Sequence, residues 1–228
     1  MSLNYFRSTV LALFVLIGVQ SAHADSITYN FTGTVHQVDP SLSGTFNTSQ
    51  TLSGSFTFET TTAGTLNGSN ASGFSNYGNA LTAWTMTVGG YTASAPFGTD
   101  IFSGLQVANN FFGNDRFVLS SRLTGTQFNG FNPLGFISLD DSSQAAFADT
   151  QLMNVGDLSG WTTLPNHSAS WYLAFSASGN SPSISGVLTS ISLTTGPASV
   201  PEPSTFTLLG IGLAMAWRAR RKLIRENG

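Results

Sequence analysis

The feature that most constrains how this chain folds is an alternation of apolar and polar residues with a period of two. It runs through residues 27–35, 52–59, 84–88, 171–177 and 187–194, where apolar side chains alternate for the most part with serine, threonine and asparagine. Because successive side chains of a β-strand point to opposite faces, each run predicts a strand with one apolar and one hydroxyl-rich face. Half-buried strands of this kind are typical of antiparallel sheets.

The runs are separated by short segments rich in glycine, asparagine and serine, which favour turns. Gly89-Gly90 predicts a hairpin turn into a strand over residues 91–95. Shorter strands are expected at residues 101–107, 116–121 and 136–140. Together these patterns predict an all-β body, an antiparallel β-sandwich with a jelly-roll-like arrangement.

Other segments of the body fit this interpretation less regularly. Residues 60–79 are rich in Gly, Ser, Asn and Thr and are expected to form a long loop. Residues 142–153 are the only part of the body where the pattern allows a short helix. Residues 42–46 and 52–56 echo each other, and two copies are too few for a solenoid, so we expect a hairpin of two similar strands.

The first 24 residues have the pattern of a secretory signal peptide. Arg7 precedes an apolar run over residues 10–19, and Ala22-His23-Ala24 supplies the small residues that signal peptidase reads. We expect cleavage between Ala24 and Asp25, which exports the body and discards His23. A retained anchor is the alternative.

The charge of the body argues against one class of partner. Between residues 25 and 199 there are nine acidic residues, no lysine and two arginines, Arg116 and Arg122, so the net charge is −7. Phosphate binding needs clustered lysine and arginine, and we therefore expect no nucleic-acid partner. Solubility must depend on hydroxyl and amide side chains, which favours a surface that hydrogen-bonds water or sugars.

The body offers few residues for nucleophilic or metal chemistry. The chain has no cysteine, and the body's histidines, His36 and His167, lie far apart in the sequence without a G-x-S-x-G or H-E-x-x-H pattern. We predict that His36 is a solvated edge residue just past a strand and that His167 lies in a turn. No catalytic residue, metal or cofactor is expected, and an exported domain of about 175 residues is large enough to be held by packing without disulfides.

The aspartates provide the best case for an enzyme. Two of them could serve as the acid and base of a glycoside hydrolase, although only fold analogy supports this. Aspartates beside Gly and Asn more commonly cap turns. Asp140-Asp141 could also join a Ca²⁺ site, but the chain has no D-x-D-x-D-G loop. The candidate carboxylates are Asp115, Asp140, Asp141, Asp149 and Asp157.

Aromatic side chains provide the case for carbohydrate contact, because an aromatic face can pack against a pyranose ring. Trp84 and Trp171 occupy the apolar phase of their strands, which predicts core packing. Trp161 lies between Gly160 and Thr162 in an expected loop. We therefore predict that Trp161 is exposed and select it as the carbohydrate-contact residue, with Tyr77 and Tyr172 as further members of a stacking platform.

The last thirty residues have a three-part organisation. A stiff extended motif comes first, because two prolines fix φ and remove two backbone donors. An apolar helix without charged residues follows at 204–217, and a basic tail occupies 218–225. The motif consists of Val200, Pro201, Glu202 and Pro203, and the helix ends with Trp217 before Arg218, Arg220, Arg221, Lys222 and Arg225.

The apolar helix is short for a membrane span. Residues 206–217 reach about 18 Å at ~1.5 Å per residue, whereas a bilayer core is ~30 Å thick. Arginine and lysine side chains can snorkel, tryptophan suits the interface, and a basic cluster marks the cytoplasmic end. We therefore predict a short transmembrane helix that anchors a precursor in the inner membrane.

The order of motif, helix and basic cluster resembles the PEP-CTERM sorting signal of Gram-negative bacteria. The resemblance covers roughly residues 200–225. It implies recognition by an exosortase, a membrane-embedded cysteine transpeptidase-like enzyme, with removal of the tail near the motif. It also implies a producer that exports exopolysaccharide. A single-pass anchor that is never processed is the alternative.

The sequence thus predicts three parts: a signal peptide (1–24), a β-sandwich domain (25–196), and a linker with the sorting signal (197–228). We expect a non-enzymatic protein of the cell surface or extracellular matrix, structural or adhesive in an exopolysaccharide biofilm. A secreted polysaccharide hydrolase that uses paired aspartates and a lectin-like carbohydrate-binding module are the alternatives.

Overall fold

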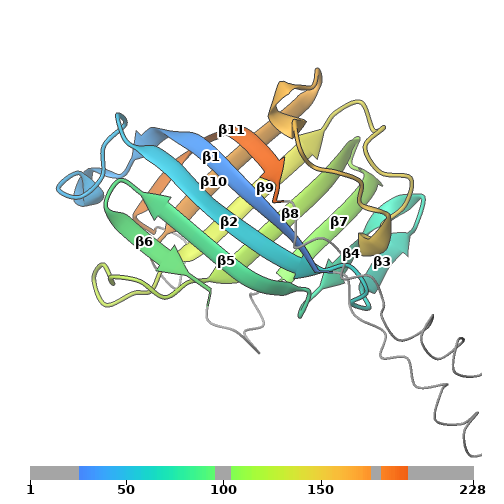
Figure 1. Cartoon of the computed structure of the whole chain (residues 1–228), viewed down its shortest axis with the longest axis horizontal. Coiled ribbons are helices and arrows are strands. Elements are labelled where there is room, and N and C mark those ends of the chain that lie inside the picture. Colours follow the sequence, from blue (N-terminus) through green and yellow to red (C-terminus); the bar gives the residue numbers. More distant parts are fainter. Residues whose placement is uncertain (1–25, 96–103, 176–180, 195–228) are drawn as a thin grey trace, which may run out of the picture. The chain divides into compact units, whose positions relative to one another are not determined.

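The computed structural model describes residues 26–95, 104–175 and 181–194, which form strands and three short 3-10 helices (Figure 1). The all-β prediction is confirmed. The strands are β1 (Ser26–Val38), β2 (Thr51–Glu59), β3 (Thr65–Ser69), β4 (Ser72–Tyr77), β5 (Leu81–Val88), β6 (Tyr91–Ser94), β7 (Gly104–Phe111), β8 (Asn114–Arg122), β9 (Leu134–Asp141), β10 (His167–Ala174) and β11 (Ser183–Leu193). The 3-10 helices are η1 (Pro40–Leu42), η2 (Leu152–Asn154) and η3 (Trp161–Thr163).

The strands of the described residues form one antiparallel sheet. Its order is β3-β4-β7-β8-β9-β10-β11-β1-β2-β5-β6, so β1 pairs with β11 near the other end of the body sequence. A sandwich would divide the strands between two hydrogen-bonded sheets. Here the ladder continues through all the described strands, and the two layers are two halves of the same curled sheet.

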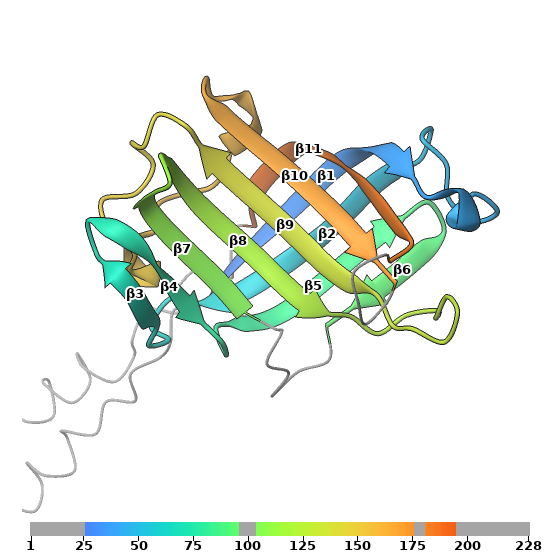
Figure 2. The same cartoon turned by 180° about the vertical axis from the view of Figure 1, so that it is seen from behind.

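The two halves face each other across an aromatic core. Figure 1 shows β1, β2 and β5 in front of β7 to β10, and Figure 2 shows the same halves from behind. The ring of Phe117 on β8 lies 5.7 Å from Phe58 and 6.4 Å from Phe56, both on β2. These side chains belong to the apolar phase of the alternation, so the pattern visible in the sequence is what fills the space between the halves.

Close packing in the core requires a glycine on β11, the strand between β10 and β1. The Trp171 indole on β10 donates from Nε1 to the Thr34 carbonyl on β1 (3.2 Å), reaching past β11, which lies between these strands. A Cβ at Gly186 on β11 would lie 1.8 Å from that carbonyl oxygen and 2.9 Å from the indole nitrogen. Only a residue without a side chain leaves room for this contact.

One end of the fold is closed by the long connection between β9 and β10, residues 142–166, which we call the covering segment (yellow to orange in Figure 1). Its apolar side chains enter the core: Phe147, Leu152, Leu158 and Trp161 are all buried. Two buried tyrosines hold its backbone, since the Tyr77 hydroxyl accepts from Leu152 N (2.9 Å) and the Tyr29 hydroxyl from Leu158 N (3.2 Å).

Several local predictions were wrong. Residues 60–79 contain the β3–β4 hairpin in place of a long loop, and residues 42–46 contain the end of η1 and a turn in place of a strand. Within 142–153 the structure has no α-helix, only the start of η2. In residues 60–79, glycine, serine and asparagine make the pattern ambiguous, because these residues suit hairpins and loops alike.

Some predictions concern residues that the structure does not describe. The signal peptide (1–24), the cleavage site at Ala22, Ala24 and Asp25, residues 101–103 and the whole sorting signal from Val200 onward lie outside the described residues. Among the described residues, no helix has the length and apolar character needed to cross a membrane. The predicted transmembrane helix therefore stays a prediction.

Candidate functional site

The aspartates proposed for hydrolysis meet at one end of the sheet. Asp115 on β8 pairs in register with Asp141 on β9, which pairs with His167 on β10. Three titratable residues thus lie in one row across adjacent strands. Asp115 and Asp141 have no exposed surface, and both accept hydrogen bonds from backbone N–H groups of the covering segment.

Asp141 is fully engaged by the backbone that follows it. Its Oδ1 accepts from the N–H (2.7 Å) and the hydroxyl (2.5 Å) of Ser143, and its Oδ2 accepts from Ala145 N (3.0 Å). Burial acts to raise the pKa of Asp141, but these hydrogen bonds, together with His167, outweigh burial and hold this pKa below its ordinary value. The ionised Asp141 carboxylate therefore fixes the turn by which the chain leaves β9 and enters the covering segment.

Asp115 ties together two more distant segments. Its Oδ1 accepts from Asn110 N (2.8 Å), and its Oδ2 accepts from Phe147 N in the covering segment (2.8 Å). A glycoside hydrolase needs its two carboxyl groups open to a sugar and a water molecule. Asp115 and Asp141 are closed off from both, and their contacts are those of structural residues.

The remaining aspartates do not complete an acid-base pair. Asp140 points to the opposite face from its neighbour Asp141, as alternation requires, and forms an ion pair with Arg116. Asp149 and Asp157 accept backbone N–H bonds from residues two positions later, the turn-capping role. Among the residues that the structure describes, no group of three or more His, Cys, Asp or Glu side chains is arranged to hold a metal ion.

Both histidines lie elsewhere than predicted. His36 is exposed as expected, but it lies within β1 and not past its end, two residues beyond the last β1–β2 pair, Thr34 with Thr51. His167 begins β10 and is not in a turn. Its Nδ1 bonds to the Pro165 carbonyl (2.9 Å), so Nδ1 is the donor, and its ring lies edge-on to Trp161 (4.4 Å between centroids).

The predicted exposure of Trp161 is wrong. Only 4% of this residue is exposed, and its ring stacks on Phe147 at 5.9 Å. Its Nε1 donates to the Ser168 carbonyl (3.2 Å), so both the apolar face and the polar end are used inside the protein. Trp84 and Trp171 are buried as predicted. Tyr77 is also buried, whereas Tyr172 is half-buried on the outer face of β10 and stacks on Phe136 at 4.8 Å.

A regular polar feature of the described residues is the outer face of β11, β1, β2, β5 and β6, which we call the hydroxyl face. Its side chains are the polar phase of the alternation, and they are exposed or half-buried. Arg116 and Arg122, the only arginines of the body, both lie on β8 and so outside this face. The hydroxyl face comprises Thr28, Asn30, Thr32, Thr34, Thr51, Ser53, Ser55, Thr57, Thr85, Thr87, Thr92, Ser94, Ser185, Thr189, Ser190 and Ser192.

Cross-strand hydrogen bonds join the hydroxyl groups of this face. Thr32 on β1 bonds to the hydroxyls of Ser190 (2.7 Å) and Thr189 (3.0 Å) on β11. Further pairs join Thr28 to Thr57 (2.9 Å), Ser55 to Thr85 (3.2 Å) and Thr87 to Thr92 (3.0 Å). Such pairs stabilise a sheet modestly and hold the hydroxyls in fixed rows.

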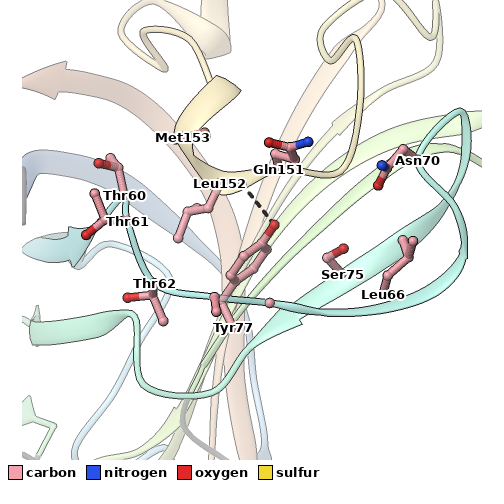
Figure 3. Close-up of a pocket in the computed structure, with 12 residues that line it drawn as sticks. Thr60, Thr61, Thr62, Leu66, Asn70, Ser75, Tyr77, Gln151, Leu152 and Met153 are labelled. Atoms are coloured by element: carbon pink, nitrogen blue, oxygen red, sulfur yellow. Dashed lines mark hydrogen bonds between the residues drawn. The ribbon is translucent and has the colours of Figure 1, made fainter.

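A pocket of about 310 Å³ lies beside the covering segment, around Tyr77 (Figure 3). Its lining comes from three parts of the chain: residues 60–64, the β3–β4 hairpin, and residues 151–153. The pocket was not predicted from the sequence, because the composition of residues 60–79 indicates a loop and not the β3–β4 hairpin that forms one of its walls. The signal that could have indicated strands here was the presence of Leu66, Phe74 and Tyr77 in a segment that is otherwise mostly polar.

Comparison with known proteins identifies one part of the chain. Residues 199–222 match the PEP-CTERM protein-sorting motif, which confirms the resemblance inferred from the prolines, the apolar run and the arginines. The motif marks the chain as an exported protein that an exosortase sorts, with a membrane-anchored precursor. No curated protein and no solved structure matches the chain.

Proposed function

We propose that this protein, which carries the PEP-CTERM sorting motif at residues 199–222, is a structural or adhesive component of an exopolysaccharide biofilm matrix and is not an enzyme. The motif supports the export and sorting. The observation that carries the role of the body is the hydroxyl face, an array of serine, threonine and asparagine over five neighbouring strands that the exposed Val187 interrupts on β11.

The chemistry of the hydroxyl face favours a polyhydroxylated partner. A hydroxyl group offers one donor and two acceptor positions, so a cross-strand pair such as Thr32 and Ser190 still has hydrogen-bonding capacity toward solvent. An extended polysaccharide presents the same groups in return. Because many weak contacts repeat along both surfaces, the interaction gains strength through multivalency.

The burial of the carboxylates supports the non-enzymatic part of the proposal. Asp115 and Asp141 are paired across adjacent strands, and both are occupied in holding the covering segment. The hydrolase alternative would need this segment to leave its core contacts before a substrate could reach them.

The sorting part is tested in the producing organism. In a variant with Pro201→Ala, Glu202→Ala and Pro203→Ala, we expect a precursor of higher mass that stays in the inner membrane, as in a strain without its exosortase. Pro197→Ala, outside the matched residues, is the control and should be processed normally. A triple variant with the natural mass and destination would contradict exosortase processing.

The role of the hydroxyl face is tested by retention of the mature protein on the producer's polysaccharide. The variant Thr32→Val/Thr87→Val/Thr92→Val removes three hydroxyls from one cross-strand row, on β1, β5 and β6, while keeping the side-chain shape. We expect retention to fall by about tenfold, the loss of roughly 1.4 kcal/mol of binding free energy.

The matched control is Thr48→Val/Thr65→Val/Thr126→Val, three exposed threonines outside the hydroxyl face. This control should be retained like the natural protein. Equal losses in the two variants, or no loss in either, would show that the hydroxyl face does not hold polysaccharide.

A further inference from the structure

We propose that the pocket around Tyr77 binds a single uncharged sugar ring, such as the terminal unit of a polysaccharide chain. This inference rests on the proposed function, since it gives the matrix protein a second, pocket-like contact apart from the hydroxyl face. The volume of about 310 Å³ is at the lower end of the range for small-molecule sites, roughly 300–1,000 Å³. A ligand of one ring fits this space better than an extended chain.

The lining of the pocket carries hydrogen-bonding groups and no charge. Its polar side chains are hydroxyls and amides, and the nearest acidic residues in the sequence, Glu59 and Asp149, do not line it. A charged ligand would lose its hydration there without finding a counter-charge, which is costly. The polar lining side chains are Thr60, Thr61, Thr62, Asn70, Ser75, Tyr77 and Gln151.

Two exposed apolar side chains stand at the same pocket. Leu66 is 43% exposed and Met153 is 61% exposed, and both belong to the few large apolar residues that the described residues leave at the surface. They come from β3 and η2, which are far apart in the sequence. Apolar contact for the C–H face of a ring, next to hydroxyl and amide partners, is the combination that a sugar requires.

The floor of the pocket is held in place from below. The Tyr77 hydroxyl donates to the Thr150 carbonyl (2.5 Å) and accepts from Leu152 N (2.9 Å), the bond drawn in Figure 3. Thr150 also shares a hydrogen bond with Ser75 (2.9 Å). This network leaves the floor with little freedom to collapse, so the pocket is formed before a ligand arrives.

The same hydrogen-bond network orients the side-chain amide of Asn70 at the pocket. Thr150 Oγ1 donates to Asn70 Oδ1 (3.0 Å), which fixes the orientation of the Asn70 side chain. The Asn70 Nδ2 group and the Gln151 amide form no hydrogen bond with other described residues, and both side chains are exposed. They are therefore available as donors to the hydroxyl or ring oxygens of a sugar.

The test measures binding of glucose, galactose, mannose and N-acetylglucosamine, with glucuronate as the charged comparison, to the mature protein recovered from its producer. Titration calorimetry and ligand-observed NMR provide the readouts. We expect saturable binding of at least one of the four neutral sugars and none of glucuronate. Failure of all four to bind, or equal binding of glucuronate, would overturn the inference.

Variants locate the binding. Thr61→Trp fills the mouth of the pocket and should abolish binding, whereas Gln151→Ala should weaken it about fivefold to tenfold through the loss of one hydrogen bond. Gln37→Ala removes an exposed glutamine of β1 that does not line the pocket, and it should leave binding unchanged. Unchanged binding in Thr61→Trp would place the sugar elsewhere and refute the assignment.

Retention on the producer's polysaccharide, measured on the same samples, separates this inference from the proposed function. If the mature protein is retained through its hydroxyl face but binds no monosaccharide, the pocket assignment fails while the matrix role stands. If sugars bind in the pocket but the hydroxyl-face variant is retained normally, the adhesive role of that face fails while the pocket assignment stands.

Discussion

The covering segment and the hydroxyl face are built from the same kinds of polar residue, yet they use them in opposite ways. In the covering segment, the contacts that tie its backbone to the sheet are made to partners hidden from water, such as Asp115 and Tyr77. Other bonds of this segment, such as the turn-capping bond of Asp157, are exposed. On the hydroxyl face, Thr32 and its neighbours bond to each other at the surface, where water is an equally good partner.

This difference teaches which polar groups hold the fold. A buried donor or acceptor that loses its partner costs about 1–3 kcal/mol, because water cannot replace the lost bond. An exposed hydroxyl that loses its partner bonds to water at little cost. We therefore expect the stability of the body to depend on the covering segment and its function to depend on the hydroxyl face.

The largest effect is expected for Asp141→Ala. It removes the acceptor for Ser143 and Ala145 at the start of the covering segment and should lower the free energy of unfolding by about 3 kcal/mol. Asp39→Ala is a close control, because Asp39 accepts the same pair of bonds, from Ser41 N (2.9 Å) and Ser41 Oγ (2.6 Å), but is only half-buried, so water can replace the lost partner. Urea unfolding measures both, and a comparable loss in Asp39→Ala would contradict the comparison.

Tyr77→Phe should have the next largest effect. The change leaves the Thr150 carbonyl and the Leu152 N–H without their shared partner, at a cost of about 2 kcal/mol. Tyr172→Phe removes the hydroxyl of a half-buried tyrosine on the outer face and is expected to change stability by less than about 0.5 kcal/mol. Equal melting temperatures for the two variants would show that the covering segment does not depend on its buried bonds.

The contribution of the buried Asp141 to stability should depend on pH. The pKa of Asp141 lies below its ordinary value of about 4, so its ionised form stabilises the folded state fully above that pH. This contribution is lost as the pH falls through the folded-state pKa. The destabilisation caused by Asp141→Asn should therefore be complete at pH 7 and shrink below about pH 4. Urea unfolding at pH 7 and pH 3 tests this, and an unchanged difference between variant and natural protein would refute it.

The smallest effect on stability is expected for Thr32→Val. The substitution breaks the bonds to Thr189 and Ser190, but valine suits a strand and the freed hydroxyls turn to water. We expect a change within about 0.5 kcal/mol in either direction. A loss as large as that of Asp141→Ala would mean that the hydroxyl face holds the fold, and the contrast between the two regions would fail.

Sequence analysis was most successful where a long pattern repeats. The alternation in residues 27–35 and 52–59 predicted both the strands and their two faces, because every second residue must share a face. It was least successful in connections. Trp161 stands in a connection between glycine and threonine, and only the packing of Phe147 and His167 around it makes it buried.

The two candidate sites also differ in whether the sequence could predict them. The sorting motif is a continuous stretch of residues, so its order alone identified it. The pocket joins residues 60–64, the β3–β4 hairpin and residues 151–153, and no local pattern records that these segments meet.

By itself, the sequence determined that the body is a β-sheet protein with one apolar and one hydroxyl face, and that its C-terminal part carries a sorting signal. The two faces follow from the alternation of residues along each strand, and the sorting signal is one continuous stretch of the chain. Only the tertiary structure decided that the sheet is continuous, that Asp115 and Asp141 are buried supports, and that Tyr77 lies beneath a pocket. These features arise from contacts between distant segments, which form only when the sheet curls and the covering segment closes its end.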